Sequence, residues 1–106
     1  MDIQIEYRTP YMVVYLSGEV DLHSSPSARE VILDCMKKKM PLLVDLSGVS
    51  YMDSSGVASL VEGYQAARKQ SLDFALVAVA QSAMNVLKLA RLDKVFPIHA
   101  SLDDVV

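Results

Sequence analysis

The chain has 106 residues, a length at which one domain buries about two-thirds of its unfolded surface. Hydrophobic residues make up 52% of the sequence and charged residues 22%, which favours a compact core over disorder. Ten Lys and Arg against thirteen Asp and Glu give a net charge of −3, so no basic surplus is available to neutralise nucleic-acid phosphates. We therefore expect one domain, residues 1–106, without direct nucleic-acid binding.

Cysteine content and hydropathy indicate where the protein works. Cys35 is the only cysteine, which excludes an internal disulfide and the paired thiolates of structural zinc sites. No stretch approaches about 18 uninterrupted apolar residues, and the N-terminus lacks the basic start and apolar run of a signal peptide. The sequence thus predicts a cytoplasmic protein without membrane insertion.

The first half of the chain predicts a hairpin and then a helix. Apolar residues alternate with polar ones over residues 3–7, and the β-branched run at residues 12–16 follows after a short turn. A helix is then expected with Ser25 as N-cap and Pro26 at its first position, ending in the basic residues 37–39.

The second half alternates strands and helices. The apolar run 42–46 predicts a central strand that is covered on both faces. Further elements are expected as a helix from about Ser54 to Lys69, a strand over 74–79, a helix around 83–90, an edge strand over 96–98 and a helical turn over 101–104. The order β-β-α-β-α-β-α-β-α predicts an α/β fold with a mixed sheet of about five strands and about four helices.

The turn Asp53–Gly56 opens the helix after the central strand. The first N–H groups of a helix have no helical partners, and Asp53 or Ser54 can cap them. Gly56 lets another surface approach the backbone closely. Taken alone, these residues indicate an ordinary helix cap.

The turn belongs to a larger sequence pattern made of three segments. Leu-Ser-Gly-Glu-Val-Asp at 16–21, Leu-Val-Asp-Leu-Ser-Gly-Val at 43–49 and Tyr-Met-Asp-Ser-Ser-Gly-Val at 51–57 occur in this order. Together they resemble the STAS domain, and more narrowly the bacterial anti-sigma factor antagonists. The resemblance extends from about Met12 to Phe96. One departure is Ser71, which stands where family members often carry glycine.

The resemblance implies a regulatory function. It implies that Ser54, with Ser55 as the fallback, is phosphorylated by a serine kinase that is also the anti-sigma factor, and that a PP2C-type serine phosphatase reverses the mark. The unphosphorylated domain is then expected to bind the anti-sigma factor, so that the sigma factor is released. The phosphorylated domain is expected not to bind the anti-sigma factor.

The partner surface is expected at one end of the sheet, where the turn after the central strand meets the loop at residues 21–25. Its expected residues are Asp21, Ser24, Met52, Asp53, Ser54, Ser55, Gly56 and Val57. Met52 is expected to be an adaptable contact. We expect the free protein to be a monomer, because its core is large enough for one copy to fold alone.

Other functions are weighed against this one. The rival is a STAS regulatory subunit that binds the ATPase of an ABC-type transporter, although such a subunit needs no phosphorylatable serine. An enzyme is not expected, because the sequence has neither a Gly-x-Ser-x-Gly elbow nor a phosphate-binding glycine loop. His23 and His99 lie far apart without other ligands at metal-binding spacing, so neither a metal nor another cofactor is expected.

Overall fold

The computed structural model describes residues 1–106 and contains five strands, three α-helices and one 3₁₀ turn. The elements are β1 (Asp2–Arg8), β2 (Tyr11–Val20), α1 (Ser25–Lys37), β3 (Leu42–Met52), α2 (Ser54–Lys69), β4 (Phe74–Val77), α3 (Gln81–Leu89), β5 (Ile98–His99) and the 3₁₀ turn Leu102–Asp104. The predicted α/β class and element order are confirmed. The expected fourth helix is a single 3₁₀ turn of three residues.

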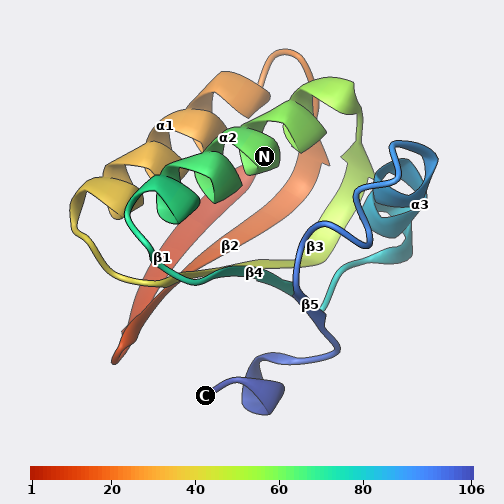
Figure 1. Cartoon of the computed structure of the whole chain (residues 1–106). Coiled ribbons are helices and arrows are strands. Elements are labelled where there is room, and N and C mark those ends of the chain that lie inside the picture. The colour runs from red at the N-terminus through yellow and green to blue at the C-terminus, as the bar shows by residue number, and fades with distance from the viewer.

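The five strands form one sheet in the order β1-β2-β3-β4-β5. β1 pairs antiparallel with β2, and every other neighbouring pair is parallel. Helices α1 and α2 lie side by side across one face of the sheet, as Figure 1 shows, and α3 packs against β3. No helix is both long and apolar enough to cross a membrane.

β3 is the third of the five strands, so the predicted central position is confirmed. All of residues 42–46 are buried. Leu42, Val44 and Leu46 belong to the core beneath the helices, whereas Leu43 belongs to a smaller cluster on the opposite face. This alternation explains the nearly unbroken apolar run, which only Asp45 interrupts, because a strand covered on both faces has no side that must be polar.

Several predicted boundaries were wrong. β2 and β3 continue past their Ser-Gly pairs and remain paired as far as Val20 and Met52, with register shifts on the way. The N-cap of α1 is Ser24 rather than Ser25, which places Pro26 at the second helical position. β4 ends at Val77, and β5 begins at Ile98, after Pro97. Phe96 is a buried core residue rather than part of the edge strand.

The turn after α2 contains Ser71 in a backbone conformation that glycine adopts most readily. Ser71 has a φ of +56°, which lies in the left-handed region. Serine pays a steric cost there that glycine does not, because its Cβ approaches the following carbonyl oxygen. Ser71 thus adopts the left-handed conformation in the turn between α2 and β4 although it is not a glycine.

Candidate partner-binding site at the start of α2

The loop after β2 and the turn after β3 lie together because the two strands are parallel neighbours. Val20 and Met52, the last residues of the two strands, are directly paired. The Asp53 N–H donates to the Val20 carbonyl over 3.3 Å, which continues the pairing into the turn. The end of β2 and the start of α2 therefore form one continuous surface, as the sequence predicted (Figure 1).

Asp53 is the N-cap of α2. Its Oδ1 accepts hydrogen bonds from the Ser55 N–H at 3.0 Å, the Gly56 N–H at 3.4 Å and the Ser55 hydroxyl at 2.5 Å. The bond from the Ser55 hydroxyl, together with those from the two backbone N–H groups, holds the pKa of the Asp53 carboxyl below its ordinary value. Of the two capping candidates in the sequence, the structure selects Asp53.

Ser54 and Ser55 differ in their surroundings. Ser55 is half-buried, and its hydroxyl is occupied by Asp53. Ser54 is exposed at the first position of α2, and its hydroxyl has no hydrogen-bond partner within the chain. Of the backbone N–H groups from Asp53 to Gly56, only that of Ser54 also lacks a partner. A free hydroxyl and a free donor therefore occur together at one exposed residue.

The loop after β2 carries a second carboxylate that is held in the same way. Asp21 Oδ1 accepts from the His23 N–H at 3.0 Å and from the Ser24 N–H at 3.1 Å, while the Asp21 N–H donates to the Ser24 hydroxyl at 2.9 Å. The backbone bond from Ser24 is the main cause that lowers the pKa of the Asp21 carboxyl. Its negative charge also acts on Asp53, whose pKa it raises slightly against the stronger hydrogen bonds.

Close packing joins the loop and the turn. A Cβ at Gly56 would lie 3.0 Å from the Val20 carbonyl oxygen and 2.9 Å from Val20 Cγ1, so α2 begins directly against the end of β2. The buried Ser59 hydroxyl donates across to the Ser25 carbonyl over 3.2 Å. These contacts leave little room for the loop and the turn to move relative to each other.

The predicted partner residues separate into an exposed group and a supporting group. Ser54 is exposed, and Asp21, Ser24, Asp53 and Ser55 are half-buried. Met52, Gly56 and Val57 are buried, with only 3% of Met52 accessible. Their side chains therefore support the turn from below, and Met52 does not have the surface exposure expected of an adaptable contact.

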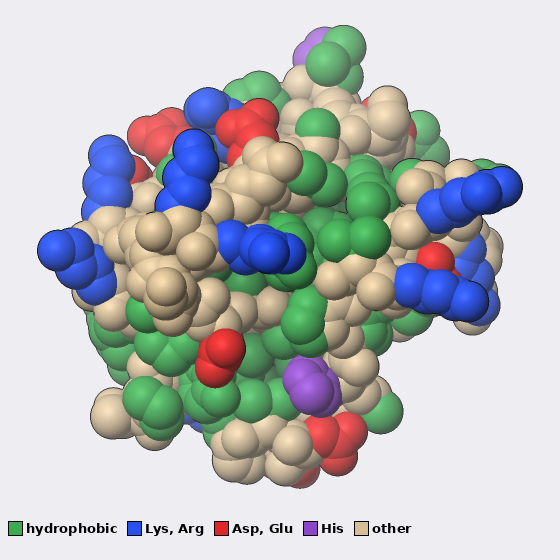
Figure 2. Space-filling model, viewed as in Figure 1, with side chains coloured by type: hydrophobic (Ala, Val, Ile, Leu, Met, Phe, Trp, Pro, Cys, Tyr) green, Lys and Arg blue, Asp and Glu red, His purple; other side chains and the backbone are tan.

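Sequence reasoning missed two exposed hydrophobic side chains at this end of the sheet. Leu22 is 71% exposed in the loop after β2, and Tyr51 is 49% exposed near the end of β3. Figure 2 shows hydrophobic and histidine side chains projecting at the top, where Figure 1 places this loop. Leu22 falls outside the strand and helix periodicities, which was the available signal that it does not belong to the core.

A polar hollow of about 450 Å³ adjoins the same loop and is lined by Gly18, Glu19, Asp21, Ser24 and Ser50, among others.

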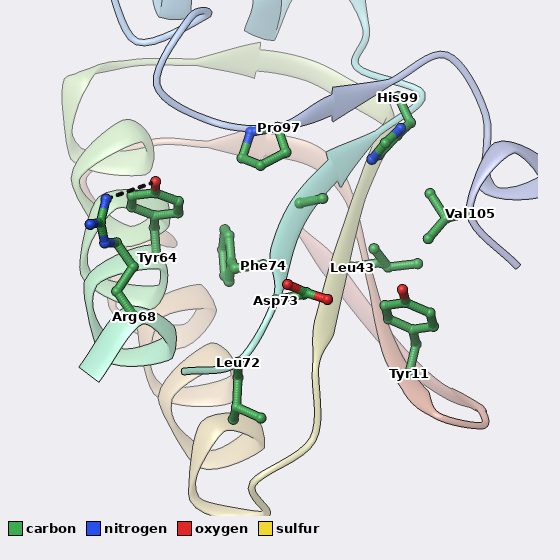
Figure 3. Close-up of a pocket in the computed structure, with 11 residues that line it drawn as sticks. Tyr11, Leu43, Tyr64, Arg68, Leu72, Asp73, Phe74, Pro97, His99 and Val105 are labelled. Carbon is green, nitrogen blue, oxygen red and sulfur yellow. Dashed lines mark hydrogen bonds between the residues drawn. The ribbon is translucent and has the colours of Figure 1, made fainter. Parts of the chain in front are cut away.

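The pocket in Figure 3 lies elsewhere in the domain, away from this loop. It has a volume of about 340 Å³ between the end of α2 and the start of β4, where Arg68 donates to the Tyr64 hydroxyl at 3.3 Å. None of the predicted site residues lines it. No group of three His, Cys, Asp or Glu side chains could hold a metal ion.

Comparison with known proteins places this geometry in a family. The family model of the STAS domain matches residues 2–105. The anti-sigma-B factor antagonist of Listeria monocytogenes is 26% identical over 102 residues, which cover 92% of this chain and 90% of the relative. The anti-sigma-B factor antagonist of Bacillus subtilis is 24% identical, with coverage of 94% of this chain and 92% of the relative.

Comparison with solved structures finds similarity to the same kind of protein. The crystal structure of an anti-sigma factor antagonist from Mycobacterium paratuberculosis is 30% identical and superposes with a TM-score of 0.85, covering 97% of this chain and 88% of that one. The anti-sigma factor antagonist SpoIIAA in its unphosphorylated form shares the fold, with a TM-score of 0.84, 21% identity and coverage of 97% and 91%. The chain therefore belongs to the STAS domain family.

Proposed function

We propose that this protein is an anti-sigma factor antagonist in a partner-switching module. In this proposal the unphosphorylated domain binds an anti-sigma factor that is also a serine kinase, and the sigma factor is thereby released. The kinase phosphorylates Ser54, which blocks binding, and a PP2C-type serine phosphatase restores it. The domain itself is not an enzyme. The names of the relatives, which are anti-sigma factor antagonists, support this assignment over a transporter subunit.

The observation that carries the proposal is the difference between the two serines. A kinase needs a hydroxyl that can enter its active site, and the Ser54 hydroxyl is exposed and free of hydrogen bonds. The Ser55 hydroxyl is half-buried and donates to Asp53 at 2.5 Å. Modification of Ser55 would require this capping contact to break first. The geometry therefore favours Ser54 over the fallback residue.

Electrostatics give the direction of the switch. A phosphoryl group adds about −1.5 to −2 charges, here beside the carboxylates of Asp53 and Asp21. Within the free domain the group meets the open Ser54 N–H and the positive end of the α2 dipole, which stabilise it by about 0.3–1 kcal/mol. A partner that packs against the turn would have to desolvate the whole cluster of negative charge, which costs far more. Phosphorylation should thus act at the interface and leave the fold intact.

The test uses the anti-sigma factor kinase of the same organism. Wild type, Ser54→Ala and Ser55→Ala are incubated with the kinase and ATP, the phosphate is mapped by mass spectrometry, and affinity for the kinase is measured before and after. We expect phosphate on Ser54 in wild type and in Ser55→Ala, and none in Ser54→Ala. Affinity should fall at least a hundredfold after modification, which corresponds to about 3 kcal/mol.

Two results would contradict the proposal. Undiminished affinity for the anti-sigma factor after phosphorylation would show that the modification does not control binding. Tight binding to a transporter ATPase in place of the anti-sigma factor would favour the rival assignment. Thr9→Ala is the matched control, because Thr9 also carries an exposed hydroxyl but lies between β1 and β2, at the end of β2 opposite Val20. It should be phosphorylated on Ser54 and should bind as wild type does.

A further inference from the structure

β1 is an edge strand with an uncovered apolar side. It pairs only with β2, so its outer edge meets no other strand. Ile3, Ile5 and Tyr7 are paired with Leu16, Val14 and Met12, which belong to the core beneath the helices. Directly paired residues share a face of the sheet, so these three side chains point to the helix-covered side.

The helices nevertheless leave this part of the face open. α1 packs over β2, and Ile5 and Tyr7 remain 49% and 58% exposed. A groove of about 500 Å³ lies between β1 and α1, lined by Ile5, Val31, Cys35 and Lys38, among others. An unpaired strand edge beside exposed apolar side chains is a surface to which another strand can be added.

The sequence of β1 is complementary to itself when it is reversed. If two copies pair antiparallel about Ile5, each residue meets a suitable partner from the second copy. Asp2 lies opposite Arg8, Ile3 opposite Tyr7, Gln4 opposite Glu6, and Ile5 opposite Ile5. Opposite charges, aliphatic–aromatic pairs and amide–carboxylate pairs are cross-strand combinations that stabilise a sheet.

The neighbouring registers are unfavourable. A shift that keeps the apolar residues on one face must move the pairing by two residues. One such shift places Asp2 opposite Glu6 of the second copy, and the other places Glu6 opposite Glu6. Like charges directly opposite each other are destabilising. The charges of β1 therefore specify one register.

From the free edge, the apolar face and the single favourable register, we propose that β1 is a homodimer interface, in which two copies form one continuous sheet about a two-fold axis at Ile5. The proposed dimer goes beyond the regulatory function proposed above, and it differs from the monomer that the sequence analysis expects. The axis reverses the strand direction, so the two Ser54 turns lie at opposite ends of the joined sheet. Each copy keeps its partner surface free.

The test reverses one charge at a time. In the proposed register Asp2→Arg sets two positive side chains opposite each other, and Arg8→Asp sets two negative ones opposite each other. Each variant alone should therefore dimerise at least about tenfold more weakly than wild type. In an equimolar mixture of the two variants a heterodimer should form, because one variant's two cations then lie opposite the other variant's two anions. Sedimentation equilibrium at concentrations up to about 0.5 mM covers the range expected for a small interface.

Asp2 is exposed, so Asp2→Arg should keep the thermal unfolding of the wild-type fold. Arg8 is exposed but pairs with Glu6 over 2.6 Å, so Arg8→Asp should unfold at a slightly lower temperature and remain folded at 25 °C. Lys88→Asp on α3 changes the net charge by the same amount as Arg8→Asp, and it should leave dimerisation unchanged. A wild-type protein that stays monomeric over the whole concentration range would overturn the proposal. So would a mixture of the two variants that sediments no differently from either variant alone.

Discussion

The Ser59 hydroxyl of α2 donates to the Ser25 carbonyl of α1 over 3.2 Å. The same oxygen lies 3.2 Å from the Ser55 carbonyl, one turn earlier in α2. Ser59 is buried, so this hydroxyl lies under the proposed partner surface and joins the two segments that would form it. The relative position of the loop after β2 and the turn after β3 is therefore set inside the domain.

Ser59→Ala should lower the free energy of unfolding by about 1 kcal/mol, because a buried hydrogen bond between the two helices is lost. Urea unfolding measures the effect. Ser50→Ala, at an exposed position of β3, is the control and should change stability by less than about 0.5 kcal/mol. Equal stability of Ser59→Ala and wild type would show that the hydrogen bond does not hold the two segments together.

Asp53→Ala should lower the melting temperature by about 5 °C at neutral pH, because the N-cap of α2 is lost. The hydrogen bond from the Ser55 hydroxyl and those from the Ser55 and Gly56 N–H groups hold the folded pKa of Asp53 below its ordinary value. The cap therefore contributes stability that is fully present above the unfolded pKa and is lost as the pH falls through it towards the folded pKa. Thermal unfolding of both proteins from pH 7 to pH 3 measures this difference.

The gap between wild type and Asp53→Ala should thus begin to narrow as the pH falls below about 4, because the ionised form of Asp53 is then progressively lost. Asp53→Asn is the matched control, since its side-chain oxygen can still accept from the Ser55 and Gly56 N–H groups, although it does not titrate. Its stability relative to Asp53→Ala should not depend on pH in this range. A gap between wild type and Asp53→Ala that does not narrow as the pH falls below about 4 would contradict the assigned role of the ionised carboxylate.

Local signals explain which parts of this fold could be predicted. The boundaries of α2 were predicted correctly, because Asp53 and the apolar period over Ser54–Lys69 lie within the helix itself or directly before it. The central position of β3 followed from its apolar run. The partner loop and turn were also placed together correctly, because parallel neighbouring strands end at the same edge of a sheet.

The predictions were wrong or incomplete where residues that are distant in the sequence determine the local structure. β2 and β3 extend beyond Ser17-Gly18 and Ser47-Gly48 because each strand supplies the other's hydrogen bonds, which no local pattern reveals. The capping role was left open between two residues because the hydrogen bond from the Ser55 hydroxyl could not be foreseen. The free edge of β1 depends on the strand order, and its uncovered face depends on the position of α1 over β2, neither of which a local pattern reveals.

Gly63→Ala should destabilise the domain by about 2 kcal/mol or more, because the added methyl group overpacks a closed interface. A Cβ at this position would collide with Ile32 Cγ2 and would lie 2.9 Å from Phe74 Cε2. Both neighbours are buried, so neither can yield easily. Gln65→Ala, at an exposed position of the same helix, should be neutral within about 0.5 kcal/mol. Urea unfolding of the two variants decides whether α1 and α2 pack as closely as described.

Ser54→Asp and Ser55→Asp add the same charge one residue apart and should differ in their effect on stability. At residue 54 the carboxylate lies exposed at the first position of α2, where the helix dipole favours it, so stability should change by less than about 1 kcal/mol. At residue 55 the carboxylate replaces the hydroxyl that donates to Asp53 and sets two negative groups together. Ser55→Asp should therefore lower the free energy of unfolding by about 1–2 kcal/mol.

Urea unfolding at neutral pH, followed by affinity measurements with the anti-sigma factor, separates the two effects. Ser54→Asp should keep the wild-type midpoint and still lose binding, because its charge acts only when a partner covers the turn. Ser55→Asp should lose stability as well as binding. If Ser54→Asp were as destabilising as Ser55→Asp, the charge at residue 54 would be acting through the fold, and an interface switch at this residue would be excluded.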